Sequence, residues 1–425
     1  MRPSLLTDRY ELTMLAAALA DGTAGRDCVF EVFARRLPHG RRYGVLAGTG
    51  RLLEQLADFR FGDAELAALR AQGLTDPALL DHLSAFEFTG DVEGYAEGEV
   101  YFPGSPVLTV RAPFGQAVLL ETLVLSILNH DSAIASAAAR MVGAAGGRPC
   151  IEMGSRRTHE EAAVAAARAA HLVGFGSTSN LAAGARYGVP TAGTSAHAFT
   201  LLHDDEAAAF RAQVEVLGTG TTLLVDTYDT MQGIRTAVEV AGTELGAVRL
   251  DSGDLADLAR QARALLDSLG AHRTRVTVTS DLDEYAIAAL AAAPVDGYGV
   301  GTSLVTGSGA PTAGMVYKLV ERDGVPVAKN AEGKRSVGGR KSAVRRHDAS
   351  GTATAEVVVP GPITPQEGDR DLLVPLVRAG RPVHDLDPAA WLRSAREHHE
   401  RVRAALPQEA WALSRGEPAL DTLTA

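Results

Sequence analysis

The chain has 425 residues, of which 46% are hydrophobic and 22% are charged. This composition supports a large folded core and excludes extended disorder. The 41 basic and 52 acidic residues give a net charge of −11, which argues against a general nucleic-acid binder. Phosphate ligands stay compatible with this charge, because local arginines and backbone amides bind them. With only Cys28 and Cys150, the chain has neither a disulfide framework nor a cysteine-based zinc site.

Residues 1–113 are expected to form a first, α+β domain. The apolar stretch Leu12–Ala20 faintly resembles a signal peptide, but it is short, and Asp8 and Glu11 lie where a basic segment should be uninterrupted. The alternation in Cys28–Arg35 predicts a strand, and the Gly, Pro and β-forming residues of Phe86–Val110 predict hairpins of an antiparallel sheet.

Residues 114–318 have a different pattern, in which short apolar runs alternate with alanine-rich helical stretches. The expected strands are Pro149–Met153, His171–Phe175, Gly188–Ala192, Thr221–Asp226, Ala247–Asp251, Arg275–Ser280 and Val295–Val300. The expected helices are Thr158–Ala170, Asp204–Val216, Thr230–Ala241, Leu255–Leu269 and Asp283–Ala292. This alternation predicts parallel strands with crossover helices. Because glycine or polar residues follow nearly every strand, we favour a closed or nearly closed barrel, whose strand ends all face one mouth.

Residues 319–425 begin with a basic segment and end in a helix. The basic residues are Lys329, Lys334, Arg335, Arg340, Lys341, Arg345 and Arg346, and we expect a solvated hairpin surface there. Asp387 and Pro388 have the residue types of an N-cap and a first helical position, so they predict the start of a helix. His398 and His399 within that helix are expected to be solvated. Ala117–Leu128 is too short for a membrane span and contains Glu121, so we expect a cytoplasmic protein with no membrane partner.

The segment Arg249–Asp254 carries the strongest chemical signal. A strand that ends in Asp251 and is followed by Ser252, Gly253 and Asp254 places carboxylates and free amide donors at one strand end. Such a site suits a ribose diol, a phosphate or a magnesium ion with few protein ligands. Helix capping by Ser252 or Asp254 explains part of this pattern equally well.

Three further segments follow predicted strands. His197, in Gly193–His197, is a candidate base or nucleophile. Arg156 and Arg157 suit a carboxylate or phosphate, although pairing with glutamates one helical turn later would also explain them. Gly299–Ser303 is a glycine-rich turn of the kind that cradles phosphate at the last strands of a barrel. Together these segments predict an anionic, phosphate-bearing substrate at the barrel mouth.

These segments resemble nicotinate phosphoribosyltransferase, of the type II phosphoribosyltransferase group. The motifs that carry the resemblance occur in family order: Thr7–Met14, Gly154–Arg157, Gly193–His197, Arg249–Asp254 and Tyr298–Thr302. A glycine-lysine hairpin at Lys334–Lys341 matches more weakly. The resemblance implies an irregular TIM-like α/β barrel, with an additional α+β sandwich domain built from the N-terminal and C-terminal segments. Residues 319–425 would then pack back on the N-terminal domain.

The resemblance also implies an activity. Nicotinate and phosphoribosyl pyrophosphate would give nicotinate mononucleotide and pyrophosphate, with coupled ATP hydrolysis, in NAD salvage. His197 matches the family histidine that ATP phosphorylates, and Asp251 would stabilise the positive charge that develops on the sugar. Magnesium on the pyrophosphate would improve the leaving group, with Asp254 as a candidate ligand. The family also implies a homodimer with shared active sites.

The resemblance assigns the binding residues as well. Those assigned to nicotinate are Tyr10, Thr194, Arg249, Ser179 and Arg156, and those assigned to phosphate or ribose are Arg157, Ser252, Gly253, Gly299, Gly301 and Thr302. The related nicotinamide-using enzyme has an aspartate where we align Ser179, so the neutral serine favours the carboxylate substrate. His197 is followed by alanine, where relatives often carry serine or glutamate, which leaves its orienting partner unidentified.

Three alternatives stay open at this stage. One is a nicotinamide- or quinolinate-specific phosphoribosyltransferase. Another is a non-catalytic nucleotide sensor on the same fold, although such a sensor would not need a phosphorylatable histidine. A third is a barrel lyase or aldolase with a Schiff-base lysine, for which Lys318 is the candidate.

Overall fold

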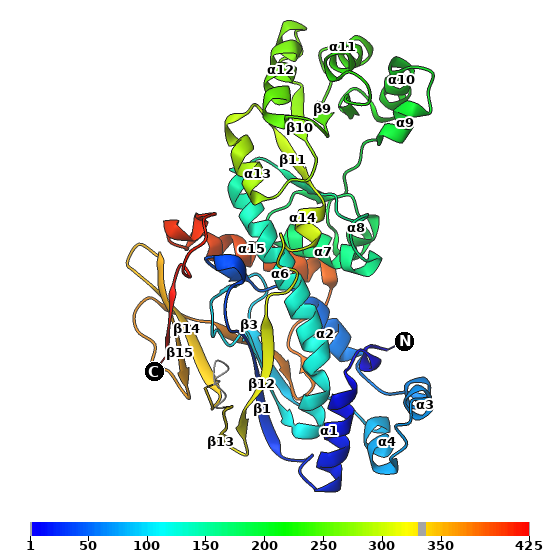
Figure 1. The fold of residues 1–425 in the computed structure, drawn as a ribbon. Coiled ribbons are helices and arrows are strands. Elements are labelled where there is room, and N and C mark those ends of the chain that lie inside the picture. The colour runs from blue at the N-terminus through cyan, green and yellow to red at the C-terminus, as the bar shows by residue number, and fades with distance from the viewer. Residues whose placement is uncertain (1, 330–336, 425) are drawn as a thin grey trace. The chain divides into compact units, whose positions relative to one another are not determined.

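The computed structural model describes residues 2–329 and 337–424 (Figure 1). The chain folds into two compact units. The first contains residues 1–136 and 310–425, and the second contains residues 137–309. The boundaries drawn at residues 113 and 318 followed changes of residue pattern along the chain, whereas these units follow contacts in space.

The first unit is built on an antiparallel sheet of seven strands. Their order is β13 (Val325–Pro326), β12 (Met315–Arg322), β1 (Asp27–Ala34), β5 (Leu108–Pro113), β3 (Asp91–Tyr95), β17 (Leu373–Arg378) and β18 (Arg381–Pro382). The antiparallel pairing of β3 with β5 confirms the hairpin prediction for this region. Smaller sheets join β2 (Gly44–Val45) to β4 (Val100–Tyr101), and β16 (Asp369–Asp371), β14 (Lys341–His347), β15 (Ala353–Pro360) and β19 (Asp421–Thr424) in that order.

Strand β1 is more deeply buried than its alternating sequence indicates. Seven of its eight residues are buried, so the polar positions of the alternation are covered as well. Glu31 is one of them, and both of its carboxylate oxygens accept hydrogen bonds from Lys341 Nζ, at 2.9 and 2.7 Å. A buried carboxylate requires such a partner, because an unpaired charge in the core is strongly destabilising.

The prediction of a solvated basic hairpin surface is wrong for the central residues of that segment. Lys341 is buried against Glu31, and Arg345 is buried with its Nη2 atom 2.6 Å from Glu356 Oε2. Arg346 Nε lies 3.0 Å from Asp369 Oδ1. The acidic partners come from distant parts of the chain, so local charge density did not reveal them. Lys334 and Arg335, and with them part of the hairpin Lys334–Lys341, lie outside the described residues.

Helices cover this sheet and build its core. They are α1 (Arg9–Ala20), α2 (Thr49–Ala57), α3 (Asp63–Ala71), α4 (Pro77–Ser84), α5 (Phe114–Ala117) and α15 (Pro388–Ala404). The continuous helical stretch 114–145, which includes α6 (Glu121–Ala145), is long and apolar enough to cross a membrane by length and composition alone. Since 67% of its most apolar window is buried inside the protein, the stretch has the burial of a core helix.

Helix α15 begins as predicted, because Asp387 Oδ1 accepts a hydrogen bond from Ala390 N at 2.7 Å. The expected exposure of its two histidines is wrong. His399 is buried and its Nδ1 atom donates to Gly98 O at 2.8 Å, and burial lowers its pKa to about 4. His398 Nε2 lies 2.8 Å from Glu99 Oε2.

The second unit is built on a parallel sheet of six strands. Their order is β7 (Ser177–Thr178), β6 (Cys150–Glu152), β11 (Gly297–Val300), β10 (Arg275–Val278), β9 (Ala247–Leu250) and β8 (Thr222–Leu224). This confirms the α/β class and the parallel pairing. The helices of the unit are α7 (Glu160–Leu172), α8 (Leu181–Tyr187), α9 (His197–Leu201), α10 (Glu206–Leu217), α11 (Thr230–Ala241), α12 (Leu255–Ser268), α13 (Glu284–Ala289) and α14 (Thr302–Val305).

Two expected strands are wrong. His171–Phe175 contains the end of α7 and the turn after it, because its apolar residues close the helix against the core. A short apolar run does not distinguish a strand from the end of a buried helix. In Gly188–Ala192, Gly188 ends α8 in the left-handed conformation at φ 68°, and Thr191 forms only an isolated bridge with Thr178.

Candidate active site

The carboxyl ends of the parallel strands surround a cavity of about 630 Å³ in the second unit. Nine residues expected at the site line it: Arg156, Arg157, Ser179, Thr194, Arg249, Asp251, Gly299, Gly301 and Thr302. The cavity also includes Met153, Ser155, Thr279, Ser280 and Asp281, to which the sequence analysis gave no role. Parallel strands place their carboxyl ends on one edge of a sheet, which is why segments 150 residues apart meet here.

The turn after β6 is held by a buried carboxylate. Glu152 accepts hydrogen bonds from Gly154 N and from Thr178 Oγ1, and burial raises its pKa. Asn180 Nδ2 donates to Ser155 Oγ at 3.0 Å, which joins this turn to the one after β7. A side chain at Gly154 would collide with Val305, so the tight turn requires glycine there.

Arg156 and Arg157 follow this turn and are exposed at the cavity. In the described part of the chain, neither forms an ion pair with Glu160 or Glu161. The alternative explanation of these arginines, pairing within the next helix, is therefore not realised, and both guanidinium groups are available to an anion.

Arg249, the third residue of β9, points into the cavity from the sheet. Its Nη1 atom donates to Thr194 Oγ1 at 3.0 Å and to Ser195 O at 3.2 Å, so it holds the 193–196 loop. Burial lowers the pKa of Arg249, and the nearby Arg156 acts in the same direction, while Asp251 and Asp226 oppose the shift. Its Nε atom is buried without a hydrogen-bond partner in the described chain. An unpaired buried donor beside an open cavity is well suited to an anionic ligand.

Asp251 is held in place from two sides. Its backbone N donates to Asp226 Oδ2 at 2.8 Å, and its own Oδ1 accepts from Thr279 Oγ1. Ser280, which follows Thr279 in the chain, has φ 141°, a backbone conformation that is rare for any residue with a side chain. Strained backbone of this kind is concentrated at functional sites, because the surrounding structure has to enforce it.

His197 is the first residue of α9 and lies beside the cavity. Its Nδ1 atom lies 3.2 Å from Thr227 Oγ1, which provides the orienting partner that the sequence left unidentified. Its Nε2 atom lies 3.9 Å from Asp226 Oδ1 and 3.8 Å from Asp251 Oδ2. The side chain of Asp226 is 3% exposed, and its Oδ1 atom has no hydrogen-bond partner in the described chain. The imidazole therefore faces two carboxylates on its Nε2 side.

Near the end of β11, Gly299 packs too closely for a side chain. A Cβ at Gly299 would lie 2.5 Å from Thr279 Cγ2 and 2.8 Å from Met153 Sδ. Gly301 is the N-cap of α14 and has φ −116° and ψ −101°, which is outside the usual helical and extended conformations. Thr302 follows it, and the turn presents backbone to the cavity.

Ser252, Gly253 and Asp254 do not line this cavity. Ser252 Oγ donates to Asp226 Oδ2 at 3.1 Å, Gly253 has φ 86°, and Asp254 caps α12 by accepting from Asp257 N at 3.1 Å. Within residues 2–329 and 337–424, no three His, Cys, Asp or Glu residues form a metal-binding group. The carboxylates at the cavity are Asp251 and Asp281. They fit Mg²⁺, which takes one or two protein carboxylates and completes its shell with substrate phosphates and water.

Tyr10 belongs to the first unit, in α1, where it is 45% exposed. Partial burial and the nearby Glu121 raise its pKa. Its neighbour Glu11 is buried and accepts hydrogen bonds from Thr122 N and Thr7 Oγ1, which fixes the start of the helix.

Comparison with known proteins gives consistent results. Residues 5–129 match the model of the nicotinate phosphoribosyltransferase N-terminal domain. The chain is 64% identical to a nicotinate phosphoribosyltransferase of Mycobacterium tuberculosis, over 99% of this chain and 95% of the relative. It resembles the crystal structure of human nicotinic acid phosphoribosyltransferase with a TM-score of 0.85 at 26% identity, covering 99% of this chain and 97% of the human one. The crystal structure of nicotinate-nucleotide pyrophosphorylase from Pyrococcus furiosus matches with a TM-score of 0.79 at 25% identity, over 97% and 96% of the two chains.

Proposed function

Because the chain belongs to the nicotinate phosphoribosyltransferase family, we propose that it makes nicotinate mononucleotide and pyrophosphate from nicotinate and phosphoribosyl pyrophosphate, coupled to ATP hydrolysis. The reaction would serve NAD salvage synthesis. The observation that carries this proposal is the single cavity that collects Arg156, Arg249 and Asp251 with a glycine turn, beside His197. The reaction needs cations that bind two anionic substrates, a carboxylate that stabilises the positive charge developing on the sugar, and a group that accepts the phosphoryl group of ATP.

Nicotinate would bind through its carboxylate. Arg249 is the central group, since a partly buried guanidinium makes strong charge-assisted hydrogen bonds. Thr194 is already in contact with it, and Arg156 adds a second positive charge at the same cavity. Ser179 lines the cavity as a neutral residue and therefore does not repel the substrate carboxylate.

The sugar reacts beside Asp251. Departure of pyrophosphate leaves positive charge on the anomeric carbon, and a fixed carboxylate stabilises that charge without reorganising. The backbone of Gly299, Gly301 and Thr302, with Arg157, would hold the phosphate groups. Ser252 and Gly253, which the family resemblance assigns to ribose or phosphate, would act by shaping the Asp251 loop from outside the cavity.

ATP would phosphorylate His197. With the ring proton on Nδ1, directed at Thr227 Oγ1, the Nε2 lone pair is free to attack. Mg²⁺, when bound, would neutralise phosphate charge and improve pyrophosphate as a leaving group. Asp251 and Asp281 are better placed for it than Asp254, whose carboxylate caps a helix.

Four finer features belong to the same proposal. The six parallel strands correspond to an irregular TIM-like barrel. The segments 1–136 and 310–425 form the accompanying α+β sandwich. Tyr10 stacks on the nicotinate ring of a partner chain in a homodimer with shared active sites, which its 45% exposure in the first unit supports. The enzyme works in the cytoplasm.

The test is incubation with γ-labelled ATP, followed by a search for an acid-labile, base-stable phosphate on His197. Separate assays with nicotinate, nicotinamide and quinolinate then identify the base. Activity confined to nicotinamide would refute the argument from Ser179. Carbon dioxide release from quinolinate would favour the second candidate, a quinolinate phosphoribosyltransferase. Nucleotide binding without turnover would indicate a sensor.

A further inference from the structure

A carboxyl group near Asp226 has no role in the reaction described above. Glu206 is the first residue of α10, which packs on α9 and α11 (Figure 1). Its Oε2 atom lies 3.2 Å from the place that a Cβ on Gly233 of α11 would occupy. Its Oε1 atom is buried and has no hydrogen-bond partner in the described chain. A buried, unpaired carboxyl oxygen is costly when the group is ionised.

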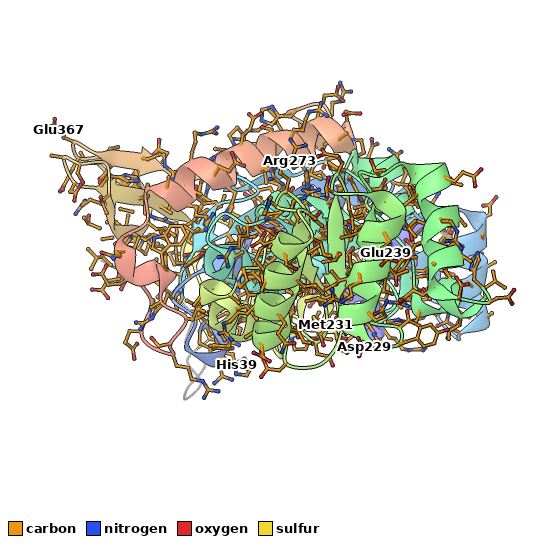
Figure 2. All side chains as sticks on the ribbon, turned by 90° about the horizontal axis from the view of Figure 1, so that it is seen from above. His39, Asp229, Met231, Glu239, Arg273 and Glu367 are labelled. Carbon is orange, nitrogen blue, oxygen red and sulfur yellow. The ribbon has the colours of Figure 1, made fainter. Side chains whose placement is uncertain are left out.

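The groups around Glu206 that carry charge are acidic. Asp226 faces it from the end of β8, and Asp229 from the N-terminal end of α11, where Figure 2 shows it beside Met231. Burial, then Asp226 and Asp229, raises the pKa of Glu206 to about 7. Near neutral pH this carboxyl group is therefore divided between its uncharged and ionised forms.

The other elements packed against Glu206 do not reverse this balance. On its own helix, Asp205 caps α10 through Ala208 N at 2.7 Å and lies 3.9 Å from Arg211. The turn after α9 contributes His203, whose Nδ1 atom is bonded to Phe199 O at 2.8 Å.

Helix α9 itself begins with His197, which connects Glu206 to the reaction. Its Nε2 atom is 3.9 Å from Asp226 Oδ1, the second buried carboxylate oxygen without a hydrogen-bond partner in the described chain. Asp226 thus interacts with both groups: its charge acts on Glu206, and its carboxylate pairs with the imidazole of His197. The charge on Glu206 acts on His197 through a carboxylate that touches both the ring and the Asp251 loop.

The charge on Glu206 becomes important when His197 is phosphorylated. The Nε2 lone pair forms a bond to the γ-phosphorus of ATP, the bond from that phosphorus to the bridging oxygen breaks, and ADP leaves with its electron pair. The ring keeps its Nδ1 proton. The incoming group brings up to two negative charges to a ring that already faces Asp226 and Asp251. A further negative charge on Glu206 would oppose the transfer.

We propose that Glu206 is a positioning residue for phosphoryl transfer to His197: its uncharged carboxyl group permits the transfer and its ionised form opposes it. This inference rests on the proposed ATP-coupled function. It makes ATP use sensitive to pH around neutrality, through a residue that touches neither substrate nor the sugar.

The first experiment compares Glu206→Gln with the wild type in single-turnover labelling by γ-labelled ATP between about pH 6 and about pH 9. We expect the wild-type rate to fall about tenfold between its plateau and about pH 8, as for one ionisation near pH 7. The Gln variant, which is permanently uncharged, should lose this fall and stay near the plateau. Glu215→Gln is the matched control, because it removes the same charge from an exposed position of the same helix.

The outcomes separate the inference from the function beneath it. If the wild type is never phosphorylated at any pH, the ATP-coupled function is wrong. If it is phosphorylated and Glu206→Gln keeps the alkaline fall, the inference about Glu206 is wrong and the function stands. If Glu215→Gln also removes the fall, the effect is a general one of net charge, and the inference is again wrong.

A second measurement uses the wild-type protein and no turnover. In protein labelled with ¹³C at the glutamate carboxyl carbon, the Glu206 resonance is identified by its absence from the Gln variant. It should titrate near pH 7, more than two units above ordinary glutamates. Titration below about pH 5 would overturn the proposal, and this result does not depend on whether the variant can be phosphorylated.

Discussion

The charge of Asp251 can be removed with little change of shape, which makes Asp251→Asn the sharpest test of the sugar step. The backbone amide of residue 251 would still donate to Asp226, and an amide group can still bond to the Thr279 hydroxyl. Folding should therefore be preserved, while the negative charge beside the anomeric carbon is lost.

The expected loss of kcat in Asp251→Asn follows from the exposure of the Asp251 side chain. The Asp251 side chain is 35% exposed, so water screens part of its field. A charge pair about 4 Å apart is worth about 1 kcal/mol in water and about 4 kcal/mol near a protein surface. The interaction energy of a partly exposed carboxylate with the positive charge on the sugar falls between these limits. Losing about 2.7 kcal/mol of this transition-state stabilisation lowers kcat about a hundredfold. We therefore expect about a hundredfold loss.

The assay is steady-state formation of nicotinate mononucleotide, together with thermal unfolding of the variant. Asp257→Asn is the control, because this exposed residue of α12 accepts a hydrogen bond from Gln261 that asparagine can also accept. Wild-type kcat in a folded Asp251→Asn protein would refute the electrostatic role. A large loss in Asp257→Asn would show that any neutralisation in this region is harmful.

Other substitutions test separate parts of the account. His197→Ala should abolish ATP hydrolysis while leaving slow, ATP-independent transfer, and an unchanged ATPase rate would remove His197 from its role. Ser179→Asp should shift the ratio of kcat/KM from nicotinate toward nicotinamide by about tenfold or more, and an unchanged ratio contradicts the specificity argument. Gly299→Ala should destabilise the protein by about 1–3 kcal/mol in denaturant unfolding, because its Cβ would meet a threonine methyl at 2.5 Å. Lys341→Met should cost about 3–5 kcal/mol, since it leaves the Glu31 carboxylate buried alone, and Glu31→Gln in the same chain should recover part of that loss.

Local sequence patterns predicted the regular elements of the second unit well. The helix expected at Thr230–Ala241 has the observed bounds, because an aspartate caps it and a glycine follows it. The strand expected at His171–Phe175 is wrong, since burial of a few apolar residues is the same whether they end a helix or form a strand. In the first unit, Lys341 was expected in solvent because its partner Glu31 is 310 residues away in the sequence.

In the candidate site, too, local sequence predicted some residues, whereas contacts between distant residues were not predicted. Residues that directly follow strands, such as Arg156 and Asp251, were predicted from their position and do line the cavity. The contact between His197 and Thr227 was not foreseen, because it depends on how the end of β8 meets the start of α9. Thr279 was overlooked as well, since a threonine at the end of a strand has no distinctive sequence signal until its hydroxyl is seen on Asp251.

The pairing of β1 bears on how the chain is synthesised. Its partner on one side, β5, follows within the first 113 residues, but its partner on the other side, β12, begins only at Met315. While the ribosome makes residues 137–309, the nascent first unit has an unpaired strand edge and a glutamate that still lacks its lysine. Exposed edges of this kind invite association with other chains. Shielding of β1 by chaperones until the last quarter of the chain emerges should therefore govern the yield of folded protein.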